Sequence, residues 1–85
     1  MTTPAVTVYT KPSCQPCRMT KKKLDAAGTI YTEVDVTQDP AALAFVKGLG
    51  YTGAPVVYVS TKEGDYHWYG LNVAEIERRI TKRAA

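Results

Sequence analysis

Residues 5–27, AVTVYTKPSCQPCRMTKKKLDAA, decide the fold that this chain can adopt. The first part, residues 5–9, alternates apolar with polar positions and is rich in β-branched residues, which predicts a short strand. The last part, residues 19–27, is rich in helix-forming residues and predicts a helix. Between them lie Cys14 and Cys17, the only two cysteines of the chain. A C-x-x-C pair at a strand-to-helix turn predicts a thiol–disulfide redox centre.

The helix after the cysteine loop has clear start and stop signals. It begins at Cys14 or Gln15, because Pro16 is tolerated only in a first helical turn. It runs to about Ala27, where Gly28 ends it. Residues three or four positions apart form the face that we expect to pack inward: Cys17, Thr20, Leu24 and Ala27.

The next segments complete a β-α-β unit. Residues 30–36 predict a second strand, with one side formed by Ile30, Thr32, Val34 and Val36. The short connection implies a right-handed crossover and a parallel strand pair. Asp39 then caps a second helix that starts with Pro40 and runs to about Leu49. We expect this helix to end at Gly48 and Gly50 and to bury Leu43, Val46 and part of Phe45.

The last third of the chain predicts a hairpin and a third helix. Residues 56–59 are apolar and indicate a strand covered on both faces. Residues 62–65 predict a turn into a further strand, residues 66–69. Asn72, with Glu75 three residues on, forms a capping-box pattern for a helix that buries Ile76 and Ile80. The predicted order is β-α-β-α-β-β-α in a single α/β domain, residues 1–85.

Composition and charge narrow the possible functions. With 85 residues, 45% hydrophobic and 22% charged, the chain suits one small folded domain. No secretory signal is visible at the N-terminus, and no run approaches the ~20 apolar residues that span a bilayer. The net charge of +3 accompanies no nucleic-acid-binding motif. We expect a cytoplasmic monomer that binds neither nucleic acid nor membrane.

The two cysteines have different expected roles. A free cysteine, with a pKa near ~8.5, is mostly protonated at neutral pH, whereas a nucleophilic cysteine must be a thiolate. Cys14 lies at the expected helix N-terminus, where unpaired N–H groups favour an anion, and Lys11 and Arg18 add positive charge. We therefore expect a lowered pKa for Cys14, the attacking thiol. Cys17, one turn further in, is expected to be more buried and to resolve the mixed disulfide.

Two other uses of the cysteine pair are disfavoured. Structural zinc requires about four ligands, and only His67, far along the chain, could join the pair, so we expect no metal. A purely structural disulfide that closes so short a loop adds little stability and is unusual in the cytosol.

Pro55 and the aromatic segment after it are further candidates. From the residues alone, a trans bond between Ala54 and Pro55 is expected, because only ~5–6% of X-Pro bonds are cis. The segment Tyr66-His67-Trp68-Tyr69 is expected to consist of ordinary strand residues, split between core and surface. If it were exposed, Trp68 would be a docking anchor for a partner protein.

Several motifs together resemble the NrdH-redoxins, small glutaredoxin-like electron donors to class Ib ribonucleotide reductase. These motifs are residues 8–12 ahead of Cys14-Gln15-Pro16-Cys17, the segment Ala54-Pro55-Val56-Val57, and His67-Trp68 followed by Gly70. The resemblance covers almost the whole chain. It implies a thioredoxin fold with a four-stranded mixed sheet flanked by three helices. It also implies a cis bond at Ala54–Pro55, which places Pro55 against the cysteine pair.

The resemblance further implies a thiol–disulfide oxidoreductase of the electron-carrier type, with Cys14 and Cys17 as its catalytic residues. Its electrons would come from NADPH through thioredoxin reductase, with no cofactor bound to the chain itself. They would pass to the large subunit of class Ib ribonucleotide reductase. The residues expected to shape the active site are Lys11, Gln15, Pro16, Arg18, Ala54 and Pro55, and those expected to dock the partner are Trp68 and Gly70.

The chain departs from the family pattern after Trp68. The family usually continues as Ser-Gly-Phe-Arg-Pro, whereas this chain reads Tyr69-Gly70-Leu71-Asn72-Val73. The main alternative is a glutathione-dependent glutaredoxin, which usually carries Cys-Pro-Tyr-Cys, Thr-Val-Pro, and Gly-Gly followed by an acidic pair. This chain instead has Cys-Gln-Pro-Cys, Gly53-Ala54-Pro55, and a single Gly70 with no carboxylate until Glu75. The remaining alternatives are a general protein disulfide reductase and a non-catalytic module that senses redox state.

Overall fold

The computed structural model describes residues 4–81 of the chain. Within that range, four strands and three helices follow one another in the predicted order, and a π-helical segment, η1, continues the last helix. Their bounds are β1 (Ala5–Thr10), α1 (Gln15–Ala26), β2 (Thr32–Asp35), α2 (Pro40–Gly48), β3 (Val56–Thr61), β4 (Gly64–Tyr69), α3 (Val73–Ile76) and η1 (Glu77–Thr81). None of the helices in this range is long and apolar enough to cross a membrane. The expected domain of residues 1–85 extends beyond the described range at both ends.

The strands form one mixed sheet in the order β2-β1-β3-β4. β1 and β2 pair in parallel, which confirms the predicted β-α-β unit. β1 and β3 are antiparallel, and so are β3 and β4, which form the predicted hairpin. β1 therefore lies inside the sheet, and its C-terminal end leads directly into the cysteine loop.

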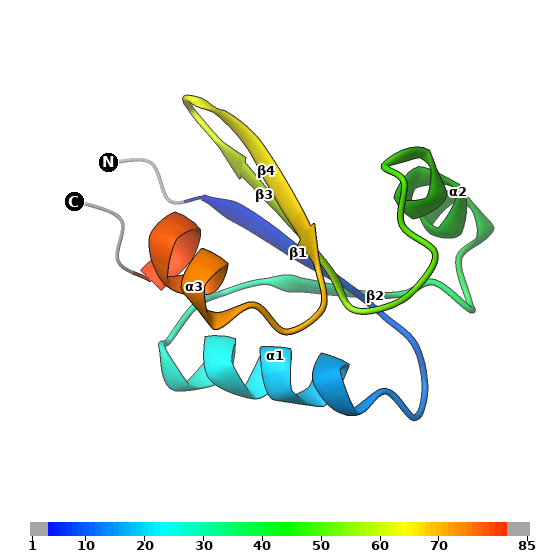
Figure 1. Ribbon diagram of the computed structural model, residues 1–85, viewed down its shortest axis with the longest axis horizontal. Coiled ribbons are helices and arrows are strands. Elements are labelled where there is room, and N and C mark those ends of the chain that lie inside the picture. The colour runs from blue at the N-terminus through cyan, green and yellow to red at the C-terminus, as the bar shows by residue number, and fades with distance from the viewer. Residues whose placement is uncertain (1–3, 82–85) are drawn as a thin grey trace.

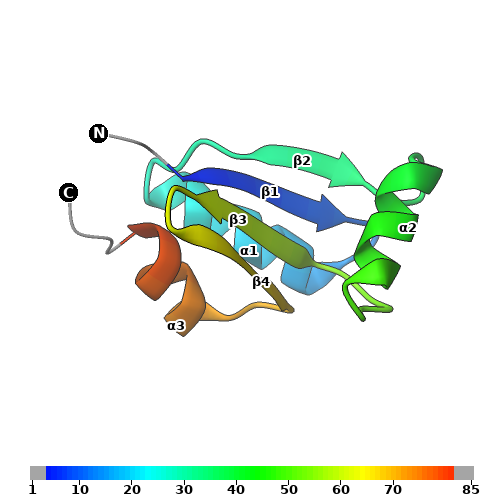
Figure 2. The same ribbon diagram turned by 90° about the horizontal axis from the view of Figure 1, so that it is seen from above.

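The main core lies between the sheet and the helices α1 and α3, which cover one face of it (Figures 1 and 2). Alternate residues of β1 and β3 point into this core, as the period of two in a strand requires. The buried side chains of the core are Val6, Val8, Leu24, Val57, Val59, Trp68 and Ile76. α2 lies on the opposite face, near one end of the sheet (Figure 2).

α1 begins and ends close to the predicted positions. Cys14 is its N-cap residue, and Gly28, with a φ of +72°, follows the C-cap. Three of the four residues expected to face inward are buried: Cys17, Thr20 and Leu24. The expectation for Ala27 is wrong, because Ala27 is the C-cap residue just beyond the helical face and is exposed.

β2 is shorter than predicted. Its pairing with β1 starts at Thr32, opposite Thr7, and ends at Asp35. Ile30 precedes the paired region and is 90% exposed, so its expected place on a buried strand face is wrong. β2 is an edge strand, and α2 covers only one end of the neighbouring face. Ile30 is therefore left in solvent, whereas the next residue, Tyr31, is partly buried and packs against the main core.

α2 starts at its predicted cap but buries less surface than expected. Asp39 Oδ1 accepts a hydrogen bond from the backbone N–H of Ala42 at 3.0 Å. Val46 is buried, whereas Leu43 is 36% exposed and Phe45 is 42% exposed. The ring of Phe45 packs on two tyrosine rings of the sheet. The predicted burial of Leu43 is wrong because α2 lies across the end of the sheet rather than along it (Figure 2).

α3 has the predicted cap. Asn72 Oδ1 accepts a hydrogen bond from the backbone N–H of Glu75 at 3.0 Å. The Glu75 carboxylate binds the side chains of Arg78 and Arg79, at 2.8 and 3.2 Å. Ile76 is fully buried against the sheet. The short helix is therefore held by one cap and by one large apolar side chain.

We expect Leu24→Ala to lower the free energy of unfolding by about 2–5 kcal/mol, because Leu24 has no solvent exposure and its loss leaves a cavity in the core. Ile30→Ala is the matched control, since it also removes an aliphatic side chain but from a position that is 90% exposed. Its effect should stay within about 0.5 kcal/mol. Urea unfolding of the oxidised proteins measures both values. Equal destabilisation by the two variants would contradict the assignment of the core.

Candidate active site

The loop between β1 and α1 presents Cys14 at the N-terminus of the helix. Ser13 has a φ of +57°, a left-handed conformation that turns the chain from the strand into the helix. Cys14 is extended, with φ −112° and ψ 104°, as an N-cap residue is expected to be. Gln15 and Pro16 begin the helix, where a proline removes no intrahelical hydrogen bond.

Cys14 and Cys17 form a disulfide, and their Cα atoms lie 5.2 Å apart. The two cysteines are three positions apart in sequence, a separation that brings both side chains to the same face of α1. Cys14 is 5% exposed and Cys17 is 2% exposed, so Cys17 is the more buried of the two, as predicted for the resolving thiol. The pair is thus in the oxidised state of a dithiol, which two electrons and two protons convert to two thiols.

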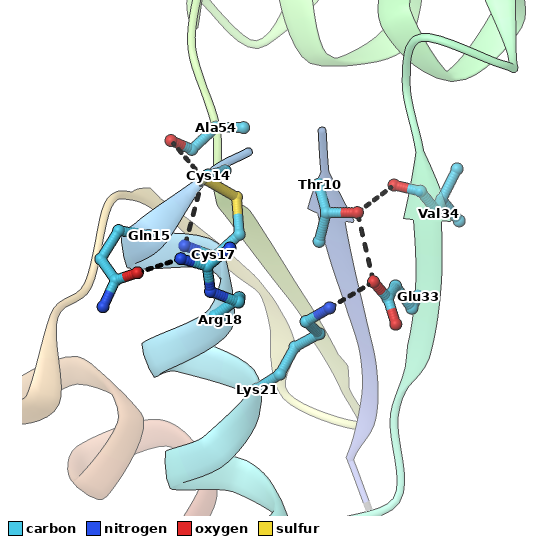
Figure 3. Close-up of a disulfide and its surroundings, with 9 residues drawn as sticks. All are labelled: Thr10, Cys14, Gln15, Cys17, Arg18, Lys21, Glu33, Val34 and Ala54. Atoms are coloured by element: carbon cyan, nitrogen blue, oxygen red, sulfur yellow. Dashed lines mark hydrogen bonds and ion pairs between the residues drawn. A yellow bond between two sulfur atoms is a disulfide. The ribbon is translucent and has the colours of Figure 1, made fainter. Parts of the chain in front are cut away.

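The sulfur of Cys14 has a hydrogen-bond donor on one side and an acceptor on the other. The backbone N–H of Cys17 donates to Cys14 Sγ at 3.2 Å. The carbonyl oxygen of Ala54 lies 3.7 Å from the same sulfur. Figure 3 shows both contacts converging on Cys14. After reduction, the N–H group favours a thiolate, whereas the carbonyl oxygen favours a thiol that can donate to it.

The segment that carries Ala54 lies directly before β3. The Ala54–Pro55 bond is cis, as the family resemblance implies. The carbonyl oxygen of Pro55 accepts a hydrogen bond from the backbone N–H of Gly70 at 2.8 Å. Gly70 has a φ of +85°, a conformation that glycine adopts without strain. The structure therefore links three predicted residues: Gly70 binds Pro55, and the preceding residue, Ala54, contacts Cys14 of the disulfide.

Trp68 does not reach this surface. It is 6% exposed and belongs to the core between the sheet and the helices. Its expected role as a docking anchor is therefore corrected: Trp68 is a core residue of β4. Side chains along a strand alternate between the two faces, so Trp68 points inward while its neighbours His67 and Tyr69 are exposed.

A cavity of about 260 Å³ opens beside the disulfide and is lined by charges of both signs. Lys11 and Arg18 line it, as expected for residues that shape the site. Arg18 binds the side-chain oxygen of Gln15 through its guanidinium group. Lys21 lines the same cavity and pairs with Glu33, with Nζ and Oε2 2.6 Å apart (Figure 3).

Three residues of this cavity were missed by sequence reasoning: Thr10, Glu33 and Asp35. Thr10 is 4% exposed, and its hydroxyl donates to Glu33 Oε2 at 3.4 Å. The signal that could have found them is the predicted parallel pairing of the first two strands. The carboxyl ends of parallel strands meet at one edge of the sheet, so polar residues at both ends come together there.

Comparison with known proteins places this site in a family. The glutaredoxin family model matches residues 6–63. The Gene 56 protein of Mycobacterium phage L5 is 47% identical over 57 residues, which cover 66% of this chain and 55% of that protein. The chain thus spans about half the length of this phage relative. The glutaredoxin-like protein NrdH of Lactococcus lactis subsp. cremoris is 32% identical over 73 residues, which cover 86% of this chain and 96% of that protein.

A solved structure supports the same family assignment. The NrdH-redoxin from Escherichia coli, described as having a thioredoxin-like activity profile, superposes with a TM-score of 0.77 at 28% identity. The match covers 87% of this chain and 92% of that one. The predicted thioredoxin fold, with its four-stranded mixed sheet and three helices, is confirmed. The matching family model, the relatives and the C-x-x-C disulfide lead to one conclusion. The chain belongs to the glutaredoxin family, in the NrdH group of thiol–disulfide oxidoreductases.

Proposed function

We propose that this protein is the dithiol electron donor of a class Ib ribonucleotide reductase and is itself reduced by thioredoxin reductase. The observation that carries the proposal is the Cys14–Cys17 disulfide at the N-terminus of α1, in a chain that aligns with almost the full length of an NrdH protein. The chain itself holds no cofactor in this proposal, and NADPH acts only through the reductase. We place the protein in the cytoplasm as a monomer, without nucleic-acid or membrane partners.

The reaction moves two electrons in two exchange steps. The thiolate of Cys14 attacks one sulfur of the partner's disulfide, which forms a mixed disulfide and releases the partner's other sulfur as a thiolate that takes up a proton. Cys17 then loses its proton and attacks Cys14 Sγ. The partner's second thiol leaves, and the Cys14–Cys17 disulfide remains. The reductase returns two electrons and two protons to this disulfide and restores both thiols.

The geometry supports both steps. The N-cap position and the Cys17 N–H group stabilise negative charge on Cys14, so that Cys14 can attack. The second attack is intramolecular, and Cys17 is held one helical turn away, with its Cα atom 5.2 Å from that of Cys14. Such fixed proximity replaces a bimolecular encounter.

The exposed residues around Cys14 determine the charge of the surface on which a partner protein would dock. Lys11, Gln15 and Arg18 are exposed around the more reactive cysteine. Positive side chains at this position favour the approach of an acidic partner surface. Gly70, whose backbone N–H donates to the carbonyl oxygen of Pro55, completes the proposed docking surface. Pro55 itself is buried and shapes the site from below this surface.

A glutathione-dependent glutaredoxin is the second candidate, because the matching family model is that of glutaredoxin. Glutathione has charged ends, which need partners of opposite sign. The first carboxylate after Gly70 is that of Glu75, which is bound to Arg78 and Arg79. This arrangement favours the thioredoxin-reductase route over the glutathione route.

The reductase test compares two electron sources for one disulfide substrate, such as insulin. We expect NADPH consumption with thioredoxin reductase and little consumption with glutathione plus glutathione reductase. Activity with glutathione alone would instead identify a glutaredoxin. Activity with neither source would favour a module that senses redox state, and the donor proposal would fail. Addition of a class Ib ribonucleotide reductase then tests the proposed acceptor directly.

We expect Cys14→Ser to abolish disulfide reduction, because it removes the attacking sulfur. Cys17→Ser should retain the first attack and accumulate a mixed disulfide with the partner, which non-reducing gel electrophoresis and mass spectrometry detect. The two variants are matched controls for each other, since each removes one sulfur from the same pair. Full multiple-turnover activity of Cys17→Ser would contradict the assigned order of attack.

A further inference from the structure

The ring of Tyr69 lies directly against the backbone of Gly53. Tyr69 is the last residue of β4 and is 56% exposed. A Cβ atom built on Gly53 would lie 2.8 Å from Cε1 and 2.9 Å from Oη of this ring. These distances are too short for any real Cβ contact, so only glycine at position 53 leaves room for the ring where it lies. The observed position of the Tyr69 ring therefore requires glycine at position 53.

A second ring holds Tyr69 in this place. Tyr51 stacks on Tyr69, with ring centroids 6.3 Å apart and planes inclined by 21°. Tyr51 is itself tied to β4, because its hydroxyl lies 2.8 Å from Nδ1 of His67. We call Tyr51, His67 and Tyr69 the aromatic clamp. The clamp fastens residues 51–53 to the end of β4.

The clamped loop leads directly to the reactive sulfur. Ala54 follows Gly53, and its carbonyl oxygen lies 3.7 Å from Cys14 Sγ. On the far side of Ala54, the backbone of Pro55 is held by Gly70 at 2.8 Å. The Ala54 carbonyl is therefore fixed from both directions along the chain, by the clamp before it and by the Gly70 hydrogen bond after it.

We propose that Tyr69 is a positioning residue that holds the Ala54 carbonyl against Cys14 and thereby sets how much of Cys14 is thiolate. When Cys14 is reduced, its S–H group donates to this carbonyl, which stabilises the thiol form. The Cys17 N–H group acts on the same sulfur in the opposite sense. The proposal rests on thiol–disulfide chemistry at Cys14 and not on the identity of the reductase or the acceptor.

The test measures the rate at which iodoacetamide alkylates Cys14 in the fully reduced protein, as a function of pH. Mass spectrometry of the digested protein separates alkylation of Cys14 from that of Cys17. We expect Tyr69→Ala to move the midpoint of the Cys14 profile to lower pH by about 0.5–1 unit, the size that follows from the loss of one hydrogen bond to the thiol. Tyr69→Phe keeps the ring contact and should match the unmodified protein.

Gly53→Ala tests the same contact without a change to Tyr69. The φ of Gly53 lies outside the left-handed region, so alanine meets no backbone strain there, and its Cβ must push the ring of Tyr69 aside. The midpoint should move in the same direction as in Tyr69→Ala. In the Tyr69→Ala background, Gly53→Ala should add no further shift, because the ring is already gone. Independent, additive shifts would overturn the proposal.

Tyr66→Ala is the control for the loss of an aromatic ring from β4. The ring of Tyr66 lies under the guanidinium of Arg79, with Cζ 3.9 Å from the ring centroid, and takes no part in the clamp. Its removal should leave the Cys14 midpoint unchanged. An unchanged midpoint in folded Tyr69→Ala and Gly53→Ala would refute the positioning role. If Tyr69→Ala does not fold, Gly53→Ala alone decides the question. No reductase enters the assay, so its outcome is independent of the proposed electron pathway.

Discussion

Leu24 lies in the middle of α1 without solvent exposure, packed among valines of β1 and β3. Thr20, one turn nearer the cysteines, is also fully buried. Because a helix is stiff over this length, these contacts fix the place and direction of its first turn. The first turn carries the Cys17 N–H group that donates to Cys14. The position of the reactive sulfur therefore depends on apolar packing two to three turns away from it.

The parts of the structure that the sequence predicted are those with a local cause. Asp39 and Asn72 cap their helices through contacts three residues away, and Cys14 caps α1 because Pro16 restricts where that helix can start. The C-x-x-C spacing by itself places both sulfurs on one helical face. For these features, the interacting residues are close in sequence, so the pattern contains all the information that is needed.

The features that the sequence misjudged depend on where distant elements lie. Leu43 and Ile30 are exposed because α2 crosses only the end of its sheet face, and no pattern within either segment records that placement. Trp68 was ambiguous for a related reason, since strand alternation gives two faces but does not say which one is covered. The cis bond at Pro55 came from the family resemblance and not from the residues. The place of Glu33 in the cavity beside the disulfide could be predicted only by knowing which strand ends are neighbours in the sheet.

The charges around the cysteine pair are more balanced than their crowding in the sequence indicates. Lys21 is paired with Glu33, and Lys23 lies 4.0 Å from Glu77. Arg18 binds the neutral side chain of Gln15, which does not neutralise its charge. Charges that are exposed and already paired act weakly on a third group. The Cys17 N–H group, in contrast, lies 3.2 Å from the sulfur and is fixed by the helix. Its effect on a Cys14 thiolate is therefore larger and less sensitive to salt than that of the lysines.

The sulfur of Cys14 thus has its environment set by two separate parts of the fold. Its donor belongs to α1, and its acceptor, the Ala54 carbonyl, belongs to the segment before β3. The sheet joins these parts, because α1 packs on the same strands that carry the segment at their ends. A change that loosens only one part shifts the balance between thiol and thiolate, whereas a change in the core alters both together. The reactivity of Cys14 can therefore vary without a change in the stability of the core.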